Sequence, residues 1–559
     1  MMTRLLKNLL AVGLGLVPCL SPGLPVIDGS FEDWEGITGV EDAVGDGSVG
    51  GVDFLTIKHA LSDDELLVYL RTAAPIDWRD SDINLYLDAD GNASTGLALG
   101  SLGADYVWDF SVIFGRGTYY GLGSSMPLHK GSLIASGAPI GLSDQLEFSI
   151  PYSVFANGSG QPTKARLFLK ANTTGDLIPQ VDGFLQVSIP LHQPPSRIRP
   201  DWGKLVDTDV RIISWNVLQD GPYAPDADPA AFGRQLQAIN PDIIHFQELY
   251  DASTTWVRGF LEEYVPAPEG KFWYVIKQHD CITASLYPIV RFWPTDNNLI
   301  LEVNLQSVWG RNAIMINAHT PASDNEAGRI TETTHMLDWI GAARENGAFA
   351  PEMPLFFIGD FNSGTITPEI ISMRTGLYPD ASGRQVELVP GFGELRDLAP
   401  VQLDSPLLYT WRSSPTSTRA RFDYIYFPPE QLWAPQSFIL APEMLSSASR
   451  ERTGIMPLND YDADHKIVGG DFRLLDGGLP GFPEPRMPEY LRNAWYSLNR
   501  LHQPWVRAYG IGWLWTVPDS SAPVDGAFWM YHLQKGWLYS AKEIWPWVWS
   551  PVNTSWVLL

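Results

Sequence analysis

The feature that most constrains the fold is an alternation of short apolar runs with helical stretches between about residues 208 and 475. Runs such as "VRIISWNVL", "DIIHFQEL", "AIMINAHT" and "LFFIGDF" are short and continuous, which is typical of strands buried on both faces of a sheet. Helical stretches, "DPAAFGRQLQAI" and "EAGRITETTHMLDWIGAA", lie between them. This order predicts an α/β domain with helices packed on sheet faces.

Polar side chains recur where these buried strands end. The chain places there Asn216, Gln247, Glu248, His319, Asp360 and Asn362, and the later segments "RFDYIYF" and "DADHKIV" add Asp423, Asp464 and His465. A single polar strand end is explained by a turn, because Asp, Asn and Gly favour turns. Polar groups in six such segments favour one shared site at a sheet edge, since a core would hold apolar residues there.

The ordered set "SWNV", "FQE", "NAH", "GDFN", "RFDYIYF" and "ADH" resembles the endonuclease/exonuclease/phosphatase superfamily (the deoxyribonuclease I-like and sphingomyelinase-like catalytic domains). The resemblance covers roughly the middle half of the chain. It implies a four-layer α/β sandwich, in which two packed mixed β-sheets are flanked by helices, with a metal site at one edge. It also implies hydrolysis of a phosphate ester by water without a covalent enzyme intermediate.

The resemblance assigns metal ligation to Asn216, Glu248 and Asp464. Their oxygens are the ligands that Mg²⁺ prefers, and Mn²⁺ and Ca²⁺ are alternatives. The sequence has no cluster of Cys and His that would indicate zinc. We therefore expect a divalent cation bound by oxygen ligands, which would supply positive charge beside an anionic phosphodiester.

The same resemblance implies catalytic roles for five further residues, His465, Asp423, Asp360, Asn362 and His319. Asp423 would orient the ring of His465, as an acid does beside a catalytic histidine. Asp360 would position or deprotonate water, Asn362 would donate to a phosphoryl oxygen, and His319 would contact phosphate or act as an acid. Whether Asp360 or His465 is the base stays open at this point.

The sequence departs from the family pattern in the segment "HDCITASLYPI", where Tyr287 precedes Pro288 at a position that is commonly basic. Ala463 stands before Asp464 where Ser is frequent, a change that spares both reactive groups. Two other histidines, His245 and His335, lack motif support and are interpreted as packing or surface groups. Arg329, in "EAGRITETT", is expected to form a structural ion pair.

The regions on either side of this domain have a different pattern. Short strand-like pieces separated by Gly, Asp and Ser predict an antiparallel β-sandwich over residues 26–190, an accessory domain that loosely resembles carbohydrate-binding modules. Linkers follow at 191–207 and 476–488, around a catalytic domain at 208–475, and residues 489–559 read as a small Trp-rich β module. The segment "DADGNASTG" within the sandwich is interpreted as a hairpin turn, with a calcium loop as the alternative.

The N-terminal 25 residues have the pattern of a signal peptide, since Arg4 and Lys7 precede a short apolar stretch that ends near Pro22. We expect an exported protein that is secreted, periplasmic or at the cell surface. A lipid anchor on Cys19 is a second interpretation, which the preceding proline disfavours. No later stretch is long and apolar enough to span a bilayer.

The charge balance bears on the substrate. The chain of 559 residues has 64 acidic and 38 basic residues, a net charge of -26, which argues against a broadly basic surface for polyanions. Our first hypothesis is an exported divalent-metal-dependent phosphodiesterase that is nuclease-like, acting on extracellular nucleic acid. The alternatives are a sphingomyelinase-like or phospholipase C-like enzyme acting on a phospholipid head group, and a non-catalytic protein whose flanking modules bind a polysaccharide or the cell surface.

Overall fold

The computed structural model describes most of the chain between residues 24 and 475. The described ranges are 24–47, 50–62, 65–77, 81–110, 115–121, 125–129, 131–139, 141–155, 163–180, 183–189, 202–350, 352–379, 385–387, 389, 392–414, 417–456 and 463–475, together with the backbone of seven short strands between 496 and 558. The predicted signal peptide and the position of Cys19 lie outside the described residues. Within the described residues, no helix is long and apolar enough to cross a membrane.

The N-terminal region is an antiparallel β-sandwich, as predicted. One sheet has the order β1 (Gly39–Glu41), β2 (Phe54–Leu61), β3 (Glu65–Asp77), β11 (Leu142–Pro151) and β10 (Ser136–Ala138). The other has the order β13 (Leu177–Ile178), β12 (Thr163–Ala171), β4 (Ile83–Asp88), β7 (Tyr106–Asp109), β8 (Arg116–Tyr119) and β9 (Met126–His129), and β14 (Leu185–Ile189) also pairs with β12. Inward-facing apolar residues alternate along strands such as β4, which is how two facing sheets share one core.

The segment "DADGNASTG" forms a turn after β4. It is not a hairpin connection, because β4 pairs with β7 and β12, whereas β5 (Leu97–Leu99) pairs with β6 (Leu102–Ala104). The side chains serve the turn itself: Asp90 Oδ1 accepts from the Asn92 amide at 2.8 Å, and Thr95 Oγ1 donates to the same carboxylate. Local hydrogen bonds of Asp and Asn therefore shape this segment. Ligand atoms of Asp88, Asp90 and Asp105 lie within 4.8 Å of one another, and the calcium alternative stays a prediction.

The central domain contains two six-stranded sheets. The first has the order β17 (Tyr274–Gln278), β18 (Cys281–Ser285), β16 (Ile243–Gln247), β15 (Val210–Asn216), β28 (Ile467–Leu474) and β27 (Leu432–Leu440). The second has the order β19 (Ile289–Thr295), β20 (Asn298–Val303), β21 (Ala313–His319), β22 (Leu355–Asp360), β26 (Asp423–Phe427) and β25 (Arg396–Asp397). Each sheet is mixed, because β15 and β16 run parallel, as do β21 and β22, while the other pairs are antiparallel.

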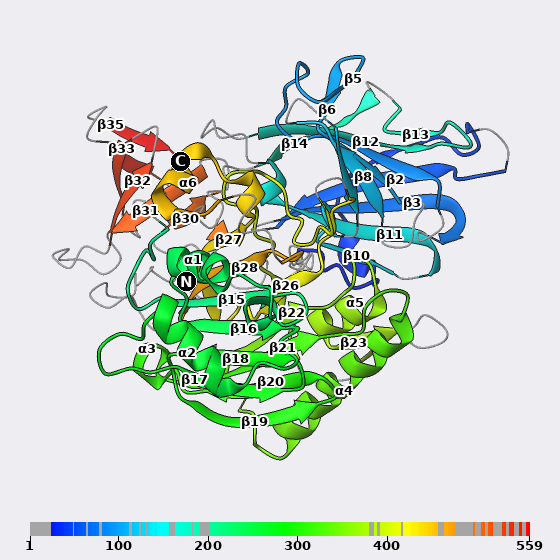
Figure 1. Cartoon of the computed structure of the whole chain (residues 1–559). Helices are drawn as coiled ribbons and strands as arrows, with labels where there is room; N and C mark the ends of the chain where they lie inside the picture. Colours follow the sequence, from blue (N-terminus) through cyan, green and yellow to red (C-terminus); the bar gives the residue numbers. More distant parts are fainter. Residues whose placement is uncertain are drawn as a thin grey trace, which may run out of the picture.

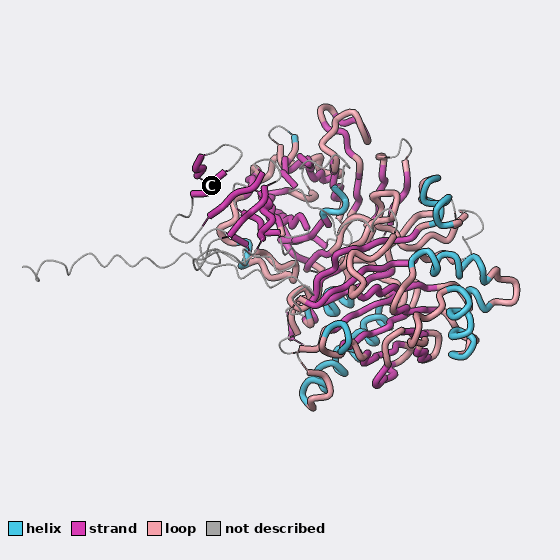
Figure 2. The backbone as a smooth tube through the Cα atoms, turned by 90° about the vertical axis from the view of Figure 1, so that its left-hand side faces the viewer, coloured by secondary structure: helices cyan, strands magenta, loops and turns pink. Residues whose placement is uncertain are grey.

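Three apolar cores hold these layers together. One lies between the two sheets and includes Phe356 and Phe472, whose ring centroids are 5.1 Å apart. A second joins the first sheet to α1 (Pro229–Ile239) and α2 (Thr254–Tyr264), and a third joins the second sheet to α4 (Glu326–Glu345) and α5 (Pro368–Thr375). Figure 2 shows these helices outside the stacked strands. The predicted four-layer α/β sandwich is confirmed.

The helices begin where the sequence supplies a capping residue. Asp228 precedes α1 and accepts a hydrogen bond from the Ala230 amide at 3.0 Å, with Pro229 in the first turn. Ser253 caps α2 in the same way by accepting from the Trp256 amide. Asn240, in the left-handed conformation, ends α1 and turns the chain into β16. The local capping signals therefore agree with the observed fold in the unit formed by β15, α1 and β16, whose strands end at Asn216 and Gln247.

The C-terminal region is also β-rich. Its described backbone forms a seven-stranded antiparallel sheet whose strands are in sequence order: β29 (Tyr496–Ser497), β30 (Trp505–Ala508), β31 (Gly512–Val517), β32 (Phe528–His532), β33 (Gly536–Ser540), β34 (Trp547–Ser550) and β35 (Ser555–Leu558). This up-and-down order confirms the predicted small β module. Its strands are drawn in orange and red in Figure 1.

Candidate functional site

The polar strand ends meet at one edge of the two packed sheets. Asn216 pairs with Gln247 at the ends of the parallel strands β15 and β16, and His319 pairs with Asp360 at the ends of β21 and β22. Asp423 begins the antiparallel strand β26 opposite Asp360. The ends of parallel strands and the starts of their antiparallel neighbours share an edge, which is why residues so far apart in sequence converge.

His465 and Asp423 form a buried pair beside Asp360. The Nδ1 atom of His465 lies 2.9 Å from Asp423 Oδ2, and its Nε2 atom lies 3.5 Å from Asp360 Oδ2. Burial alone would disfavour the charged ring, but the carboxylates of Asp423 and Asp360 outweigh it and raise the pKa of His465 to about 10. Burial raises the pKa of Asp360. The ring is thus a cation facing a buried carboxyl group.

A second histidine pair flanks Asp360, and sequence reasoning missed its acid. Nδ1 of His319 lies 2.5 Å from Asp280 Oδ2, and Nε2 lies 3.8 Å from Asp360 Oδ2. Burial opposes the charge on His319, but Asp280 raises its pKa to about 9; burial likewise opposes the charge on Asp280, yet His319 lowers its pKa to about 2. Asp280 was missed because it precedes β18. The antiparallel pairing of that strand with β16 places its start at the site.

Two of the three predicted metal ligands are in direct contact. The Nδ2 atom of Asn216 donates to Glu248 Oε1 at 2.9 Å and to Asp360 Oδ2 at 3.0 Å. The Gln219 amide donates to Glu248 Oε2 at 2.8 Å. Glu248 has a φ of +64°, an uncommon conformation for a residue with a side chain. The turn after β16 therefore holds this carboxylate at the edge beside Asn216 and Asp360.

The third predicted ligand, Asp464, has a partner that sequence reasoning also missed. Trp411 donates its indole N–H to Asp464 Oδ2 at 2.8 Å. The other oxygen, Oδ1, is buried without a hydrogen-bond partner among the described residues. An unpaired carboxylate oxygen is costly to bury, so this atom is one that a ligand or ion would satisfy.

Asn362 is tied to the backbone around Asp360. Its amide N–H donates to Asp360 Oδ1 at 2.8 Å, and its Nδ2 donates to the carbonyl oxygen of Thr320 at 3.0 Å. Its φ of +47° puts it in the left-handed region that Asn tolerates better than most residues. In this structure Asn362 shapes the turn that orients Asp360, and its side-chain N–H faces Thr320.

A buried polar layer lies behind this edge and joins the two sheets. Asn317 on β21 donates to the Ile282 carbonyl and to Thr283 Oγ1, both at 3.2 Å, and accepts from Gln247 Nε2 at 2.8 Å. Thr283 Oγ1 in turn lies 3.0 Å from His245 Nδ1. Because buried polar groups need partners, these bonds fix the register of one sheet against the other. His245 thus has a packing role, as predicted.

The remaining sequence predictions concern residues outside the site. Nε of Arg329 lies 2.9 Å from Glu369 Oε1 in a buried ion pair, which confirms its structural role. The half-exposed side chain of His335 pairs with Asp296 on the surface. Tyr287 is buried, with only 4% of its surface exposed. The position that is commonly basic in the family therefore does not present a side chain to solvent here.

The donor set fits a hard divalent cation. Among the described residues, the carboxylates of Glu248, Asp280, Asp360, Asp423 and Asp464 gather around the buried ring of His465 and the part-buried ring of His319. The half-exposed ring of His279 also pairs with Asp280. This excess of negative charge, together with the unpaired oxygen of Asp464, suits a cation with oxygen ligands. Ligand atoms of Asp360, Asp423 and His465 also lie within 4.8 Å of one another. There, however, the ring is held by Asp423 as a protonated donor. A cation at Glu248, Asn216 and Asp464 stays a prediction.

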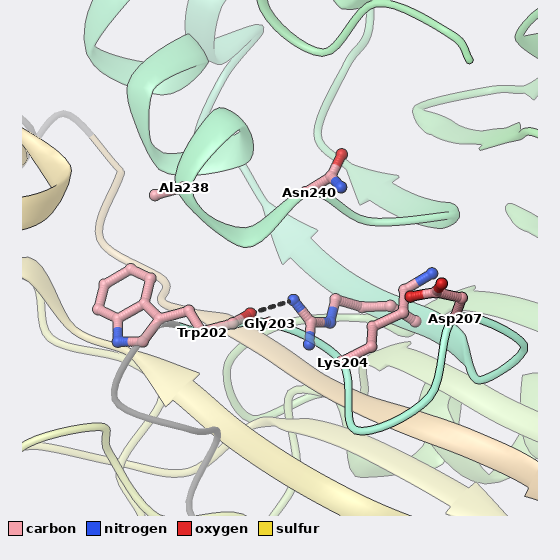
Figure 3. A pocket seen from close by; sticks show the side chains of 7 residues that line it. Trp202, Gly203, Lys204, Asp207, Ala238 and Asn240 are labelled. Carbon is pink, nitrogen blue, oxygen red and sulfur yellow. Dashed lines mark hydrogen bonds between the residues drawn. The ribbon is translucent and has the colours of Figure 1, made fainter. Parts of the chain in front are cut away.

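A separate cavity of about 360 Å³ opens at the opposite end of β15, beside Trp202, Lys204 and Arg211. Arg211 Nη1 donates to the backbone oxygen of Trp202 at 2.8 Å. Figure 3 shows Trp202, Lys204 and Asp207 among the residues that line the cavity. Arg211 also pairs with Asp471, and Lys204 pairs with Asp242. Since these cations already have carboxylate partners, the cavity offers little net charge to an anionic substrate. The polar strand ends, not this cavity, form the candidate active site.

One comparison with known proteins identifies a family for the central domain. A family model described as "Endonuclease/Exonuclease/phosphatase family" matches residues 213–449. No curated protein matches the chain.

Several solved structures align with nearly half of it. Humanized D. rerio TDP2 is 17% identical, with 48% of this chain and 99% of that chain covered and a TM-score of 0.30. The human Nocturnin catalytic domain with bound sulfate anion is 16% identical, with 48% and 96% covered and a TM-score of 0.31. ANGEL2, a 2',3'-cyclic phosphatase, was solved in complex with adenosine-2',3'-vanadate and is 14% identical to this chain. The alignment covers 48% of this chain and 96% of that chain, with a TM-score of 0.34. Scores this low carry no weight by themselves, and the assignment rests on the family model and the ordered motifs. The central domain of this chain belongs to the endonuclease/exonuclease/phosphatase superfamily.

Proposed function

We propose that this protein is a divalent-metal-dependent phosphodiesterase that cleaves its substrate by direct attack of water. The family supports a hydrolase, and one observation carries the finer proposal. The buried carboxyl group of Asp360 lies between two histidines, His465 at 3.5 Å and His319 at 3.8 Å, each held by its own acid. That arrangement supplies a proton acceptor and two cationic donors around one point, which is what hydrolysis of an anionic ester requires.

Asp360, His465 and His319 have different roles in the proposed reaction. Asp360 accepts a proton from the attacking water, because both neighbouring rings are held as cations by carboxylates and are therefore poor bases. His465, oriented by Asp423, donates to a phosphoryl oxygen as negative charge grows on it. His319, oriented by Asp280, protonates the leaving oxygen.

Glu248, Asn216 and Asp464 would hold the divalent cation. When bound, such an ion polarises a phosphoryl oxygen and offsets the charge of the phosphodiester. Asn216 also bridges Glu248 and Asp360 through one amide group, so it sets the spacing between the cation ligands and the proton acceptor. Replacement of Asn216 by Ala is expected to impair both cation affinity and turnover.

Paired variants test these roles. Asp360→Asn removes the proton acceptor but keeps the shape of the side chain, and it is expected to lower kcat by about 100-fold or more, within the usual range for general base catalysis. His465→Gln is expected to lower kcat as well, but the remaining activity should keep its dependence on a deprotonated Asp360. If Asp360→Asn retains full turnover, Asp360 is not the base.

Nucleic acid remains the first proposed substrate. The family supports it, and the net charge of -26 argues against it. One observation favours phospholipid as the second candidate. Phe272, in the segment "VPAPEGKFWYVI", is 51% exposed and its ring lies 4.1 Å from that of Tyr274. An exposed Phe ring that packs on a part-buried Tyr ring suits contact with a lipid surface.

Plasmid DNA and sphingomyelin vesicles separate the two substrate classes. The nuclease proposal expects Mg²⁺-dependent cleavage of DNA that is unchanged by Phe272→Ser. The lipid proposal expects release of phosphocholine from vesicles that falls with Phe272→Ser, while hydrolysis of soluble bis-p-nitrophenyl phosphate stays the same. Cleavage of vesicles alone would overturn the nuclease proposal.

Export and surface attachment are further proposals. The N-terminal sequence supports export, through its two basic residues and short apolar stretch. The sandwich and the Trp-rich module would bind a polysaccharide or another cell-surface ligand. Fractionation of cells that produce the full chain, followed by N-terminal sequencing, tests export; retention of the uncleaved chain in the cytoplasm would contradict it.

A further inference from the structure

The loop between β25 and β26, described at residues 398–414 and 417–422, has one side buried in the N-terminal sandwich. Five of its apolar residues belong to the same core as strands β2, β3, β4 and β11: Ala399, Val401, Leu407, Leu408 and Tyr409. Leu407 and Leu408 are each only 1% exposed. The described residues of this long loop form no helix and no strand longer than one residue, so the loop needs some other source of order. The sandwich core provides it.

Backbone contacts tie the same loop to the edge of the sandwich. Leu128 on β9 forms a parallel bridge with Arg419, and the His129 amide donates to the Arg419 carbonyl at 2.6 Å. Ser153 Oγ donates to the carbonyl oxygen of Ala399 at 3.3 Å. The β25–β26 loop therefore pairs with β9 as well as packing against the core, and both kinds of contact restrict where its backbone lies.

The other side of this loop contacts the candidate active site. Thr410 Oγ1 accepts from the amides of Phe422 and Asp423 at 3.0 and 3.1 Å. The Lys466 amide donates to the Thr410 carbonyl at 2.6 Å, and the Arg412 amide donates to the Asp464 carbonyl at 2.9 Å. Backbone bonds from the loop thus fall on both sides of His465.

Consecutive residues connect the two sides. Tyr409 lies in the sandwich core, Thr410 supports Asp423, and Trp411 bridges to His465 and donates to Asp464. In an extended segment, neighbouring side chains point in opposite directions. A shift of the sandwich would therefore be transmitted within two residues to the side chains of the site.

The fit between the sandwich and the central domain is close. Gly131, which follows β9, has a φ of +69°, and a Cβ atom there would lie 2.8 Å from Tyr424 Oη and 3.2 Å from Arg421 Cβ. Figure 1 shows the sandwich strands β10 and β11 next to the part of the central domain that contains α5 and β26. A module tethered only by a flexible linker would not need a glycine at this contact.

We infer that the N-terminal β-sandwich is a positioning element of the candidate active site, which holds the β25–β26 loop so that Asp423, Asp464 and His465 keep their places. This inference rests on the proposed function of those residues. It assigns the sandwich a role in turnover that is independent of any sugar or surface ligand. Because a displacement of about 1 Å in a catalytic group can cost about 100-fold in rate, loosening the loop is expected to lower kcat more than it changes KM.

Matched truncations in the full chain test this inference. Leu408→Ala removes an anchor of the loop from the sandwich core. Leu169→Ala removes the same atoms from the same core, at a fully buried position on β12, four strands from β9. Both are assayed with bis-p-nitrophenyl phosphate and Mg²⁺, at a temperature well below the unfolding transition of each. We expect Leu408→Ala to lower kcat by about 10- to 100-fold with KM within about twofold, and Leu169→Ala to keep kcat within about twofold.

A conservative rescue and a second variant complete the test. Leu408→Met restores volume and is expected to recover most of kcat, and Gly131→Ala, which changes only the sandwich side, is expected to reproduce the loss.

NMR of the His465 ring in the full chain gives a readout that does not depend on turnover, since the ring resonances should move in Leu408→Ala and not in Leu169→Ala. Equal kcat in all variants, with His465→Ala inactive, would overturn the inference alone. Full activity of His465→Ala would instead overturn the proposed function.

Discussion

The pairing of His319 with Asp280 makes a prediction that depends on pH. Asp280→Asn removes the charge 2.5 Å from Nδ1 of His319 and keeps the shape of the side chain. In the native chain that pair raises the pKa of His319 to about 9, from an ordinary value of 6.5. Without the acid, the buried ring loses its main stabilising partner, and its pKa is expected to fall toward the ordinary value or below it.

The size of the effect follows from these pKa values. A difference of about 2.5 in the pKa of His319 corresponds to about 3.4 kcal/mol; Asp360 and Glu248 still favour the charged ring in the variant, and burial opposes it. At pH 8 a ring with a pKa of 9 is about 90% protonated, and one with a pKa of 6.5 is about 3% protonated. If His319 protonates the leaving oxygen, kcat of Asp280→Asn falls about 30-fold at pH 8 and hardly at all at pH 5.5.

The same pair links stability to pH. Asp280, whose pKa is lowered from 3.8 to about 2, contributes stability above pH 3.8 and loses that contribution as the pH falls toward 2. His319, whose pKa is raised, contributes stability that is fully present below pH 6.5 and is lost as the pH rises toward 9. The native chain should therefore lose more stability between pH 6.5 and 9 than Asp280→Asn does.

Initial rates with bis-p-nitrophenyl phosphate at pH 5.5 and 8 measure the first effect, and NMR titration of His319 in EDTA measures the pKa directly. Asp296→Asn is the matched control, because it removes the acid partner of the half-exposed His335 on the surface. It should leave both profiles unchanged. A deficit in Asp280→Asn that is the same at both pH values, or a His319 pKa that stays near 9 in that variant, would refute the reasoning.

Three further outcomes are expected. Glu248→Gln weakens Mg²⁺ binding, measured by calorimetry, by about 10-fold or more, because a charged oxygen ligand is lost; unchanged affinity would place the cation elsewhere. Asp397→Ala leaves the fully buried guanidinium of Arg421 without its carboxylate partner and lowers the free energy of unfolding by about 3–5 kcal/mol in urea titrations; a loss below about 1 kcal/mol would contradict this. Phe356→Ala, in the core between the two sheets, lowers the free energy of unfolding by about 3–5 kcal/mol and leaves kcat per folded molecule unchanged. A large fall in kcat of the fully folded variant would show that this core also positions the catalytic residues.

Much of the fold and of the site was predictable because both depend on local patterns. Continuous apolar runs identified the buried strands. The C-terminal ends of β15, β16, β21 and β22 gave Asn216, Glu248, His319 and Asp360. Asp280 escaped this reasoning because it precedes a strand, and only the antiparallel pairing of β18 reveals that its start lies at the same edge. A search for polar residues at both ends of each strand would have included it.

Trp411 and the β25–β26 loop were not predictable for a different reason. The segment from Leu407 to Trp411 has neither helical periodicity nor the length of an ordinary strand, so nothing local marks it as a support for Asp464 and His465. Its order comes from contacts with the sandwich, more than 200 residues earlier in the chain. Asn362 shows a related limit: its residue type indicated the site, but only the φ of +47° shows that its amide serves the turn at Asp360.

The most direct test of the account is hydrolysis of bis-p-nitrophenyl phosphate by the full chain, with Mg²⁺ and with EDTA, beside His465→Ala. The account predicts turnover that needs the divalent cation, is abolished by EDTA, returns when Mg²⁺ is restored and falls by at least about 100-fold in the folded His465→Ala variant. Turnover that persists in EDTA, or that is equal in His465→Ala, would contradict the claim that this sheet edge is a metal-dependent phosphodiesterase site.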